Sequence, residues 1–380
     1  MDAVSPAAIA AAPFRIGAAA IAGWSAYLLG LARRGAGPLD LVDDATAFVN
    51  VLTDRDRPGW AHPWPVALQW PLARLRDCTV ASPSTAGTVP TLLLPPQAGT
   101  DSCIVDHSTE RSQIAALHAG GLTRLYCLDW LPATAETDGD SIDEHLAVVA
   151  EAVAHLGGRV NLIGDSQGGW LGAVYAALHP DEVHTLTVAG APIDFHADRP
   201  GLGLLGHLPR RAGAAAAALV YDTGHLLGVH LTDPVGEVQR AMDLLAGLDD
   251  PEVIARITEQ RRWFVWRQPI PAAFRDWIVE HLVVGNELVR GELVIGGRRV
   301  DLAEIDCPLI LLAGTGDLLA PPAQVHALAA LVGTAPERIS LHTVEDGHIG
   351  LFVGRRVLAE QWTPIASAVA AQSGSAAGFG

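Results

Sequence analysis

The segment that most constrains the fold of this chain is residues 159–178, where an apolar run leads through a glycine-flanked serine into an Ala- and Gly-rich stretch. Arg159–Ile163 is typical of a buried strand, and Gly168–Leu178 has the composition of a helix that ends before a proline. Between them lies the motif Gly-Asp-Ser-Gln-Gly. A serine there must sit on a sharp, strained turn, and the two glycines leave room for it. The segment therefore predicts a strand–turn–helix unit that exposes Ser166 as a nucleophile.

From about residue 90 onward the sequence alternates between short β-rich runs and helical stretches. The candidate strands are Thr91–Leu94, Leu122–Leu128, Arg159–Ile163, Val183–Val188, Pro308–Ala313 and Ile339–Val344. The candidate helices are Ser141–His155, Gly168–Leu178 and Val357–Ala370. Continuous apolar strands are typical of a sheet that is covered on both sides. The pattern predicts an α/β fold, with a mostly parallel central sheet and helices on both faces.

Two regions interrupt this alternation. The N-terminal part is rich in Trp and Pro and only weakly periodic, and its segment 59–71 is expected to wrap the sheet without regular structure. A later stretch separates two strands by far more than an ordinary loop and is expected to form an inserted lid subdomain. The expected divisions are an extension (1–84), a core (85–194 with 303–371), the lid (195–302) and a disordered tail (372–380).

The apolar stretch Ile16–Ala32 lies between Arg15 and the pair Arg33-Arg34. It is too short and too rich in Gly and Ala to predict a transmembrane helix, and it lacks the basic start of a secretory signal. We favour a helix packed on the domain. The alternative is an apolar surface anchor.

Composition excludes some functions. The net charge of −17 argues against nucleic acid as a partner, because phosphate binding needs clustered Lys and Arg. The four cysteines have neither metal-site nor redox spacing, and a reduced, cytoplasmic setting fits them best. No metal or organic cofactor is expected.

A nucleophilic serine needs a base and an acid, which in this arrangement follow it along the chain in the order Ser, acid, His. Pro308–Ala313 leads into a Gly-rich turn that ends in Asp317, and the next candidate strand leads to His348. His348 is expected to take the proton of Ser166, while Asp317 fixes its tautomer. Glu345 and Asp346 are rival acids, but they lie so close to His348 in sequence that they are expected to solvate or shape its loop.

Two backbone N–H groups are expected to hold the oxyanion. One belongs to Gln167. The other should come from the loop after Thr91–Leu94, where two prolines have no N–H and leave Gln97 or Ala98. For the substrate, Trp130, Trp263 and Trp266 are candidate wall residues, with ordinary core packing as the alternative for each.

The sequence resembles the polyhydroxyalkanoate synthase and intracellular polyhydroxybutyrate depolymerase branch of the α/β-hydrolase superfamily. The closest matches are the Ser166 motif and Gly347-His348-Ile349, and looser ones lie in the same order at residues 125–130, 190–194, 286–302 and 316–321. The resemblance implies a Cys or Ser nucleophile at position 166, with Asp317 and His348 as partners, and an acyl-enzyme on 3-hydroxyacyl esters or thioesters. Synthases and some of the depolymerases carry Cys where this chain has Ser166.

We therefore expect a serine hydrolase that cleaves 3-hydroxyalkanoate-like esters. Serine favours release of the acyl group to water, and the polar side chains of Asp165 and Gln167 could help retain that water. One alternative is an acyltransferase or thioesterase on acyl-CoA, which would need a basic site for the nucleotide phosphates, whereas the basic residues cluster no further than pairs such as those at 210–211, 261–262 and 298–299. Another alternative is a non-catalytic protein that binds polymer granules or lipid. Association with either surface through the N-terminal apolar segment is also possible for the enzyme.

Overall fold

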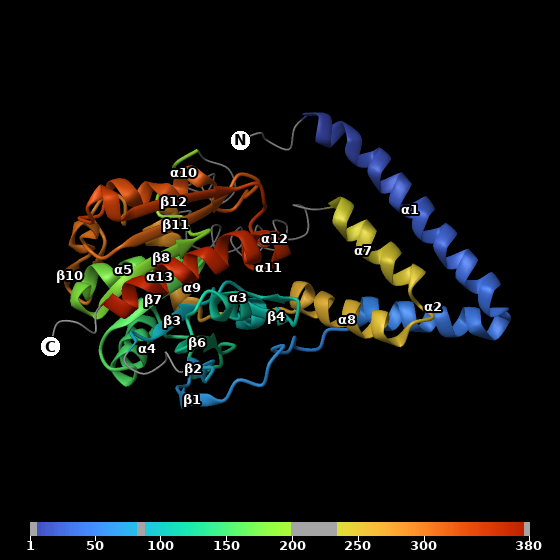
Figure 1. Ribbon diagram of the computed structural model, residues 1–380, viewed down its shortest axis with the longest axis horizontal. Helices are drawn as coiled ribbons and strands as arrows, with labels where there is room; N and C mark the ends of the chain where they lie inside the picture. The colour runs from blue at the N-terminus through green and yellow to red at the C-terminus, as the bar shows by residue number, and fades with distance from the viewer. Residues whose placement is uncertain (1–5, 82–87, 199–233, 376–380) are drawn as a thin grey trace. The chain divides into compact units, whose positions relative to one another are not determined.

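The computed structural model describes residues 6–81, 88–198 and 234–375, which divide into two compact units (Figure 1). One unit combines the chain up to Gly59 with the segment that ends at Trp266, and we call it the helical unit. The other holds the rest of the described residues, and we call it the sheet unit. The segment expected to form a lid is therefore divided between the two, and its Ala-rich run 212–220 lies outside the described residues.

The sheet unit is built on eight strands in the order β1-β2-β6-β3-β7-β8-β11-β12. Their bounds are β1 (Val66–Gln69), β2 (Ala73–Asp77), β3 (Thr91–Leu94), β6 (Leu125–Trp130), β7 (Val160–Asp165), β8 (Val183–Ala189), β11 (Leu309–Gly314) and β12 (Ile339–Val344). From β6 to β12 all neighbours are parallel, whereas β1 and β2 run antiparallel at one edge. The mostly parallel sheet predicted from the sequence is confirmed.

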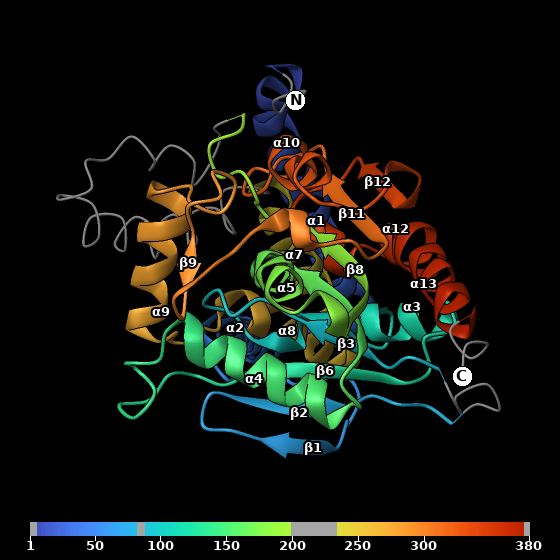
Figure 2. The same cartoon turned by 90° about the vertical axis from the view of Figure 1, so that its left-hand side faces the viewer.

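Helices cover both faces of this sheet. Figure 2 shows α3 (Gln113–Ala119) and α13 (Thr363–Ser375) together on one side, and α4 (Ile142–His155) and α5 (Gln167–Leu178) on the other. Every residue of β3, β7 and β11 is buried as a result, which explains why these strands are mostly apolar. The edge strand β12 is half exposed and carries the polar residues Ser340, His342 and Thr343. This layered packing is the α/β-hydrolase fold.

Two local expectations were wrong. Part of the segment expected to wrap the sheet irregularly forms β1, and β2 follows it. Ala73 and Leu75 of β2 are buried while Arg74 and Arg76 are more exposed, so a period-two pattern was present but short. At the other end, α13 continues to Ser375 and takes in the start of the tail that was expected to be disordered.

The helical unit contains α1 (Pro6–Arg34) and α2 (Pro38–Thr53) from the N-terminus, with α7 (Pro234–Ala246) and α8 (Pro251–Val265) from much later in the chain. Figure 1 shows α1 beside α7 and α2 beside α8. A small apolar core joins all four helices: Tyr27, Val51, Leu244, Leu245, Leu248 and Ile257. At Gly23 a Cβ would stand 2.5 Å from the Cβ of Met242, so glycine there allows α1 to approach α7 closely.

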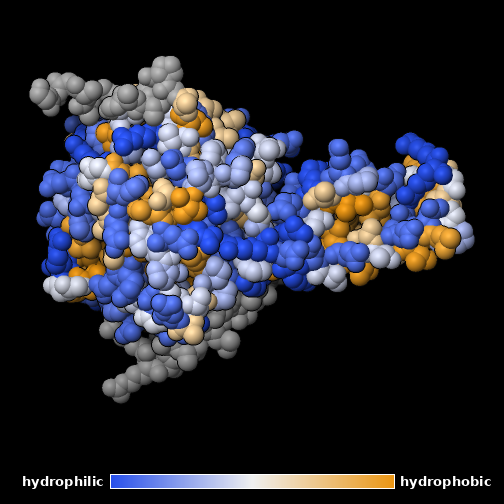
Figure 3. Space-filling model, turned by 90° about the horizontal axis from the view of Figure 1, so that it is seen from below, coloured by the Kyte–Doolittle hydropathy of each residue, from blue (hydrophilic) through white to orange (hydrophobic). Residues whose placement is uncertain are grey.

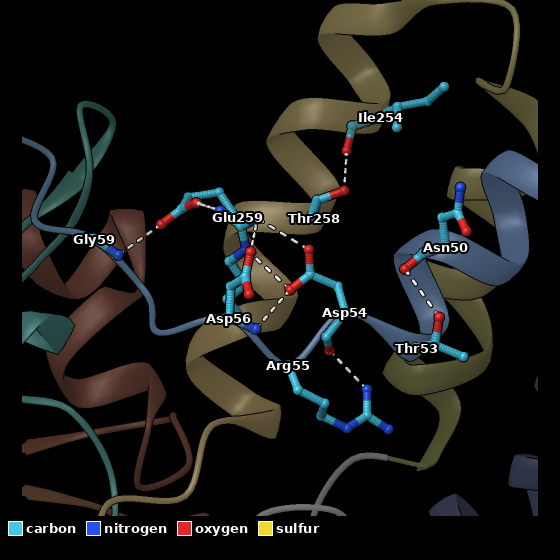
Figure 4. A network of polar contacts seen from close by, with 10 residues as sticks. Asn50, Thr53, Asp54, Arg55, Asp56, Gly59, Ile254, Thr258 and Glu259 are labelled. Atoms are coloured by element: carbon cyan, nitrogen blue, oxygen red, sulfur yellow. Dashed lines mark hydrogen bonds and ion pairs between the residues drawn. The ribbon is translucent and has the colours of Figure 1, made fainter.

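Charged side chains join the end of α2 to α8 (Figure 4). The guanidinium of Arg262 donates to both carboxylate oxygens of Asp54, at 3.1 and 2.9 Å, and to Asp56 and Glu259 at 3.2 and 3.0 Å. The other oxygen of Glu259 accepts from the N–H of Gly59 at 2.8 Å. These bonds lower the pKa of Asp54, because its hydrogen bond with Arg262 favours the charged carboxylate.

Candidate active site

Ser166 lies on the turn between β7 and α5, with φ 51° and ψ −118°. This conformation is unfavourable for a residue with a Cβ, and its N–H is fixed by a 2.7 Å bond to the carbonyl of Ala189. Both flanking positions need glycine because a side chain there would clash. A Cβ on residue 168 would lie 1.9 Å from the carbonyl oxygen of Leu94, and a Cβ on residue 164 would lie 2.3 Å from the carbonyl oxygen of Gly168. The strained turn predicted for the serine is therefore present.

The structure brings together the three residues predicted to form a triad. The hydroxyl oxygen of Ser166 lies 2.9 Å from Nε2 of His348, and Nδ1 of His348 lies 2.7 Å from Oδ2 of Asp317. Asp317 follows β11 and is 2% exposed; its other oxygen accepts from the N–H groups of Leu319 and Ala320. A neutral His348 that donates from Nδ1 to the carboxylate presents the lone pair of Nε2 to Ser166. The arrangement can remove the proton of Ser166.

The rival acid Asp346 has a different task. Its Oδ1 accepts from the N–H of Gly347 at 2.8 Å, and its carbonyl accepts from the N–H of Gly316 at 3.0 Å. It thereby holds the loop before His348 against the turn that leads to Asp317. For Asp346, this agrees with the expectation that it shapes the loop before His348.

The candidate oxyanion donors lie around Ser166. Gln167 is the first residue of α5, so its N–H belongs to the helix-start groups that have no acceptor within the helix. Ala98 lines the same cavity as Ser166. The side chain of Gln97 points away into the core, where it is 1% exposed and its Oε1 lies 2.7 Å from Nε2 of the buried His145. Of the two alternatives for the second donor, Ala98 is the one that lines the cavity beside Ser166.

The cavity beside Ser166 is mainly apolar. Its lining residues are Ala98, Ser166, Gln167, Trp170, Pro192, Phe195, Ile278, Leu319, Ala320 and His348. A cavity with apolar walls and a single reactive polar corner suits an acyl group whose carbonyl faces the serine.

The three tryptophans proposed as substrate wall residues lie elsewhere. Trp130 is 1% exposed, and its indole N–H donates to the carbonyl of Pro95 at 2.9 Å, beneath the candidate oxyanion loop. Trp263 and Trp266 belong to the helical unit, where Trp263 is buried and packs edge-on against Phe264. The aromatic residues that do line the cavity, Trp170 and Phe195, were not singled out from the sequence. Trp170 lies four residues after Ser166 on a predicted helix, which could have placed it beside the nucleophile.

Asp165 does not flank the reacting serine as a water-retaining group, and that expectation was wrong. Its side chain is fully buried, and its Oδ1 accepts from Nε2 of Gln113 at 3.1 Å. Burial raises the pKa of Asp165 to about 8, a rise that the bond from Gln113 partly opposes. Oδ2 of Asp165 and Oε1 of Gln113 have no hydrogen-bond partner among the described residues.

The chain is similar to several known proteins. The sequence model of a family described as "Protein of unknown function (DUF3141)" matches residues 61–378. The poly(3-hydroxyalkanoate) polymerase subunit PhaC of Allochromatium vinosum is 29% identical over 272 residues, which cover 68% of this chain and 74% of that one. The subunit of the same name from Synechocystis is 29% identical over 67% of this chain and 70% of that one. Among solved structures, a monoacylglycerol lipase from Paleococcus ferrophilus covers 75% of this chain and 97% of its own, with 18% identity and a TM-score of 0.48.

Proposed function

Because the chain belongs to the DUF3141 family, whose description assigns no reaction, we propose its activity from the site: a serine hydrolase that cleaves carboxylic esters through an acyl-enzyme. More broadly, the chain is an α/β hydrolase related to polyhydroxyalkanoate enzymes. The observation that carries the proposal is the hydrogen-bonded path from Asp317 through His348 to Ser166.

The reaction follows from this geometry. His348 takes the proton of Ser166 as the hydroxyl oxygen attacks the ester carbonyl, and Asp317 stabilises the imidazolium that forms. The N–H of Gln167, with that of Ala98 as the candidate second donor, stabilises the negative charge on the carbonyl oxygen. His348 then protonates the departing alcohol. A water molecule, activated by the same histidine, releases the acid and restores Ser166.

For the substrate we propose 3-hydroxyalkanoate esters, as oligomers or polyester. Two findings support this choice. The walls of the cavity are apolar over most of their extent, which suits an alkanoate chain. The related proteins are named as polymerase subunits for poly(3-hydroxyalkanoate), so esters of this kind occur in their chemistry.

The same names favour a second candidate, acyl transfer that lengthens a polyester. A polymerase must keep water from its acyl-enzyme until the next hydroxyacyl group arrives, and a thiolate is well suited to exchange between thioesters. The hydroxyl at position 166 attacks only while His348 removes its proton, and its oxygen ester is commonly released to water. We therefore place hydrolysis first.

The test is a comparison of products from two substrates with one enzyme sample. Incubated with an amorphous 3-hydroxyalkanoate polyester, the enzyme should release 3-hydroxy acids or short oligomers, detected by chromatography. Incubated with 3-hydroxyacyl-CoA, it should form little polymer. Polymer from the CoA substrate, without soluble acid from the polyester, would reverse the order of the two candidates. Ser166→Ala controls for contaminating activity, and Ser166→Cys asks whether a thiol shifts the balance toward polymer.

A further inference from the structure

The surface of the helical unit is unusually apolar. Twelve large hydrophobic side chains are exposed in the described part of the chain, and nine of them lie on α1 and α2. On α1 they are Phe14, Ile21, Trp24, Leu28 and Leu29, and on α2 they are Leu39, Leu41, Val42 and Val49. Figure 3 shows hydrophobic residues gathered over the helices of this unit, bordered by hydrophilic ones. Single exposed apolar residues are ordinary, but such a concentration marks an interaction surface.

The exposed residues of α1 form a stripe. Phe14, Ile21 and Leu28 are spaced seven residues apart, so their side chains project from nearly the same side of the helix, with Trp24 close by. Over residues 13–34, where burial is described, a narrow stripe on the opposite side is buried, and it faces α7. The expectation that this segment is too short to cross a membrane was wrong: by length and composition alone, the helix over residues 13–34 could do so, with a mean hydropathy of 1.3 and 17% of its most apolar stretch buried.

The buried stripe keeps α1 attached to the protein. Ala19, Gly23 and Tyr27 are buried, and the hydroxyl of Tyr27 donates to Asp44 of α2 at 2.9 Å. Arg34 at the end of α1 pairs with the same carboxylate. A helix that crossed a bilayer would lose these contacts, so the packing favours a helix that lies in a surface with one face inserted.

The charged residues of α1 indicate which kind of surface its exposed face would bind. The charged residues of α1 are Arg15, Arg33 and Arg34, all basic, in a chain whose net charge is −17. They flank the apolar stretch at both ends, where anionic headgroups would meet an inserted helix. An indole such as that of Trp24 is enriched at the lipid–water boundary. A neutral polyester surface would gain nothing from the arginines, and a second copy of α1 would bring like charges together.

We propose that the exposed face of α1 docks the protein on an anionic phospholipid surface. Phe14, Ile21, Trp24 and Leu28 enter the boundary between headgroups and acyl chains, while Arg15 and Arg33 contact the phosphates. This docking does not depend on the reaction proposed for Ser166, and its failure would leave turnover of soluble esters unchanged.

The first experiment is co-sedimentation of the full chain with vesicles of phosphatidylglycerol and phosphatidylcholine, beside vesicles of phosphatidylcholine alone. We expect tighter binding to the anionic vesicles and weaker binding as salt is added, because salt screens the arginines. Ile21→Asp with Leu28→Asp should weaken binding by about tenfold or more, since two inserted apolar side chains become charged. The matched control is Leu341→Asp on the edge strand β12, because Leu341 is 54% exposed and Leu28 is 58% exposed.

A second measurement does not depend on the folding of the double variant. Lipids brominated near the glycerol should quench part of the tryptophan fluorescence of the wild type, and Trp24→Phe should abolish that quenching. Equal vesicle binding by the wild type and the double variant, or quenching that survives in Trp24→Phe, would overturn the proposal. So would binding to polyester particles without binding to vesicles. If the wild type is dimeric without lipid and the double variant is monomeric, the exposed face of α1 binds a second copy of the chain instead.

Discussion

At Ser166 the backbone and the side chain are held by different neighbours. The backbone is fixed by the bond from its N–H to Ala189 and by the close packing of Gly168 on Leu94. The hydroxyl is oriented by His348 alone among the described contacts. A substitution of the side chain should therefore remove the chemistry and leave the turn in place.

Ser166→Ala and His348→Ala should each lower ester turnover by about a thousandfold or more, because triad members act as one unit. Asp317→Asn should cost somewhat less, because the histidine keeps its place but loses the charge that fixes its tautomer. Initial rates on a p-nitrophenyl ester measure these losses, with circular dichroism as the check on folding. His155→Ala, at an exposed histidine near the end of α4, is the matched control and should keep wild-type activity. Activity of Ser166→Ala within about tenfold of wild type would exclude the assignment.

The buried pair of Asp165 and Gln113 predicts how stability depends on pH. Burial raises the pKa of Asp165 from 3.8 to about 8, so between these values the folded chain holds a proton that the unfolded chain has lost. The free energy of unfolding should therefore fall as pH rises through this window. Asp165→Asn cannot ionise. Its amide oxygen can accept a hydrogen bond from Nε2 of Gln113, and its amide nitrogen can donate one to Oε1 of Gln113.

Near pH 8 the Asp165→Asn variant should melt several degrees above the wild type, and near pH 4 the two should melt together. Thermal unfolding followed by circular dichroism at both pH values checks this. A variant that is less stable at pH 8, or a difference that does not change with pH, would show that the carboxyl is charged in the folded chain.

At the scale of elements, α5 rests on β3 and β7 through glycines that differ in how much room they have. A Cβ on Gly168 would overlap the carbonyl of Leu94, whereas one on Gly172 would lie 3.4 Å from Leu162 Cδ2, which is ordinary contact. Gly168→Ala should displace the loop that carries Ala98 and lower both activity and melting temperature. Gly172→Ala should keep activity and gain up to about 1 kcal/mol from helix propensity. The pair is compared by esterase rates and thermal melts, and equal behaviour would mean that close packing does not shape the turn.

The central strands and the turn at Ser166 could be predicted because the residues that cause these structures lie within their own sequences. β3, β7 and β11 are mostly apolar since both faces are covered, and the glycines at 164 and 168 signal the strained turn. The antiparallel edge was missed because β1 and β2 are short. The pairing of β2 with β6, on which this edge depends, is a tertiary contact that a local pattern does not contain.

The candidate site shows the same difference between residues placed by local sequence and residues placed by tertiary contacts. The triad was predictable because each member follows a strand of a parallel sheet, and the ends of such strands meet at one edge. Phe195 and Ile278, in contrast, enter the cavity from segments placed by distant contacts. The N–H of Phe195 donates to the side chain of Asn286, and the Nε2 of Gln324 donates to the carbonyl of Phe195. Nothing near Phe195 in the sequence reveals these partners.

At the scale of the whole molecule, the two units predict separable stability. Deleting residues 1–34 removes Tyr27 from the small core and exposes Leu244 and Leu245 of α7, so the helical unit should melt several degrees lower or lose its transition. The sheet unit has its own core, and Ser166 should still react with a fluorophosphonate probe. Differential scanning calorimetry and probe labelling of the same sample test this. Phe14→Ala, at a side chain 83% exposed, is the control and should leave both unchanged. Loss of labelling together with the transition would show that the units do not fold independently.

The construction of the helical unit from both early and late segments has a consequence for the chain as it is made. Tyr27 leaves the ribosome long before Leu244, its partner in the same core, has been translated. At about 5–20 residues per second, the intervening residues take on the order of 10 to 40 seconds to appear. During that interval α7 is not yet present to cover the buried stripe of α1, so both the buried and the exposed stripes of α1 remain uncovered. The core that α1 shares with α7 can therefore form only after α7 has been made, and we expect a nascent chain of this protein to depend on a chaperone that binds apolar helices until then.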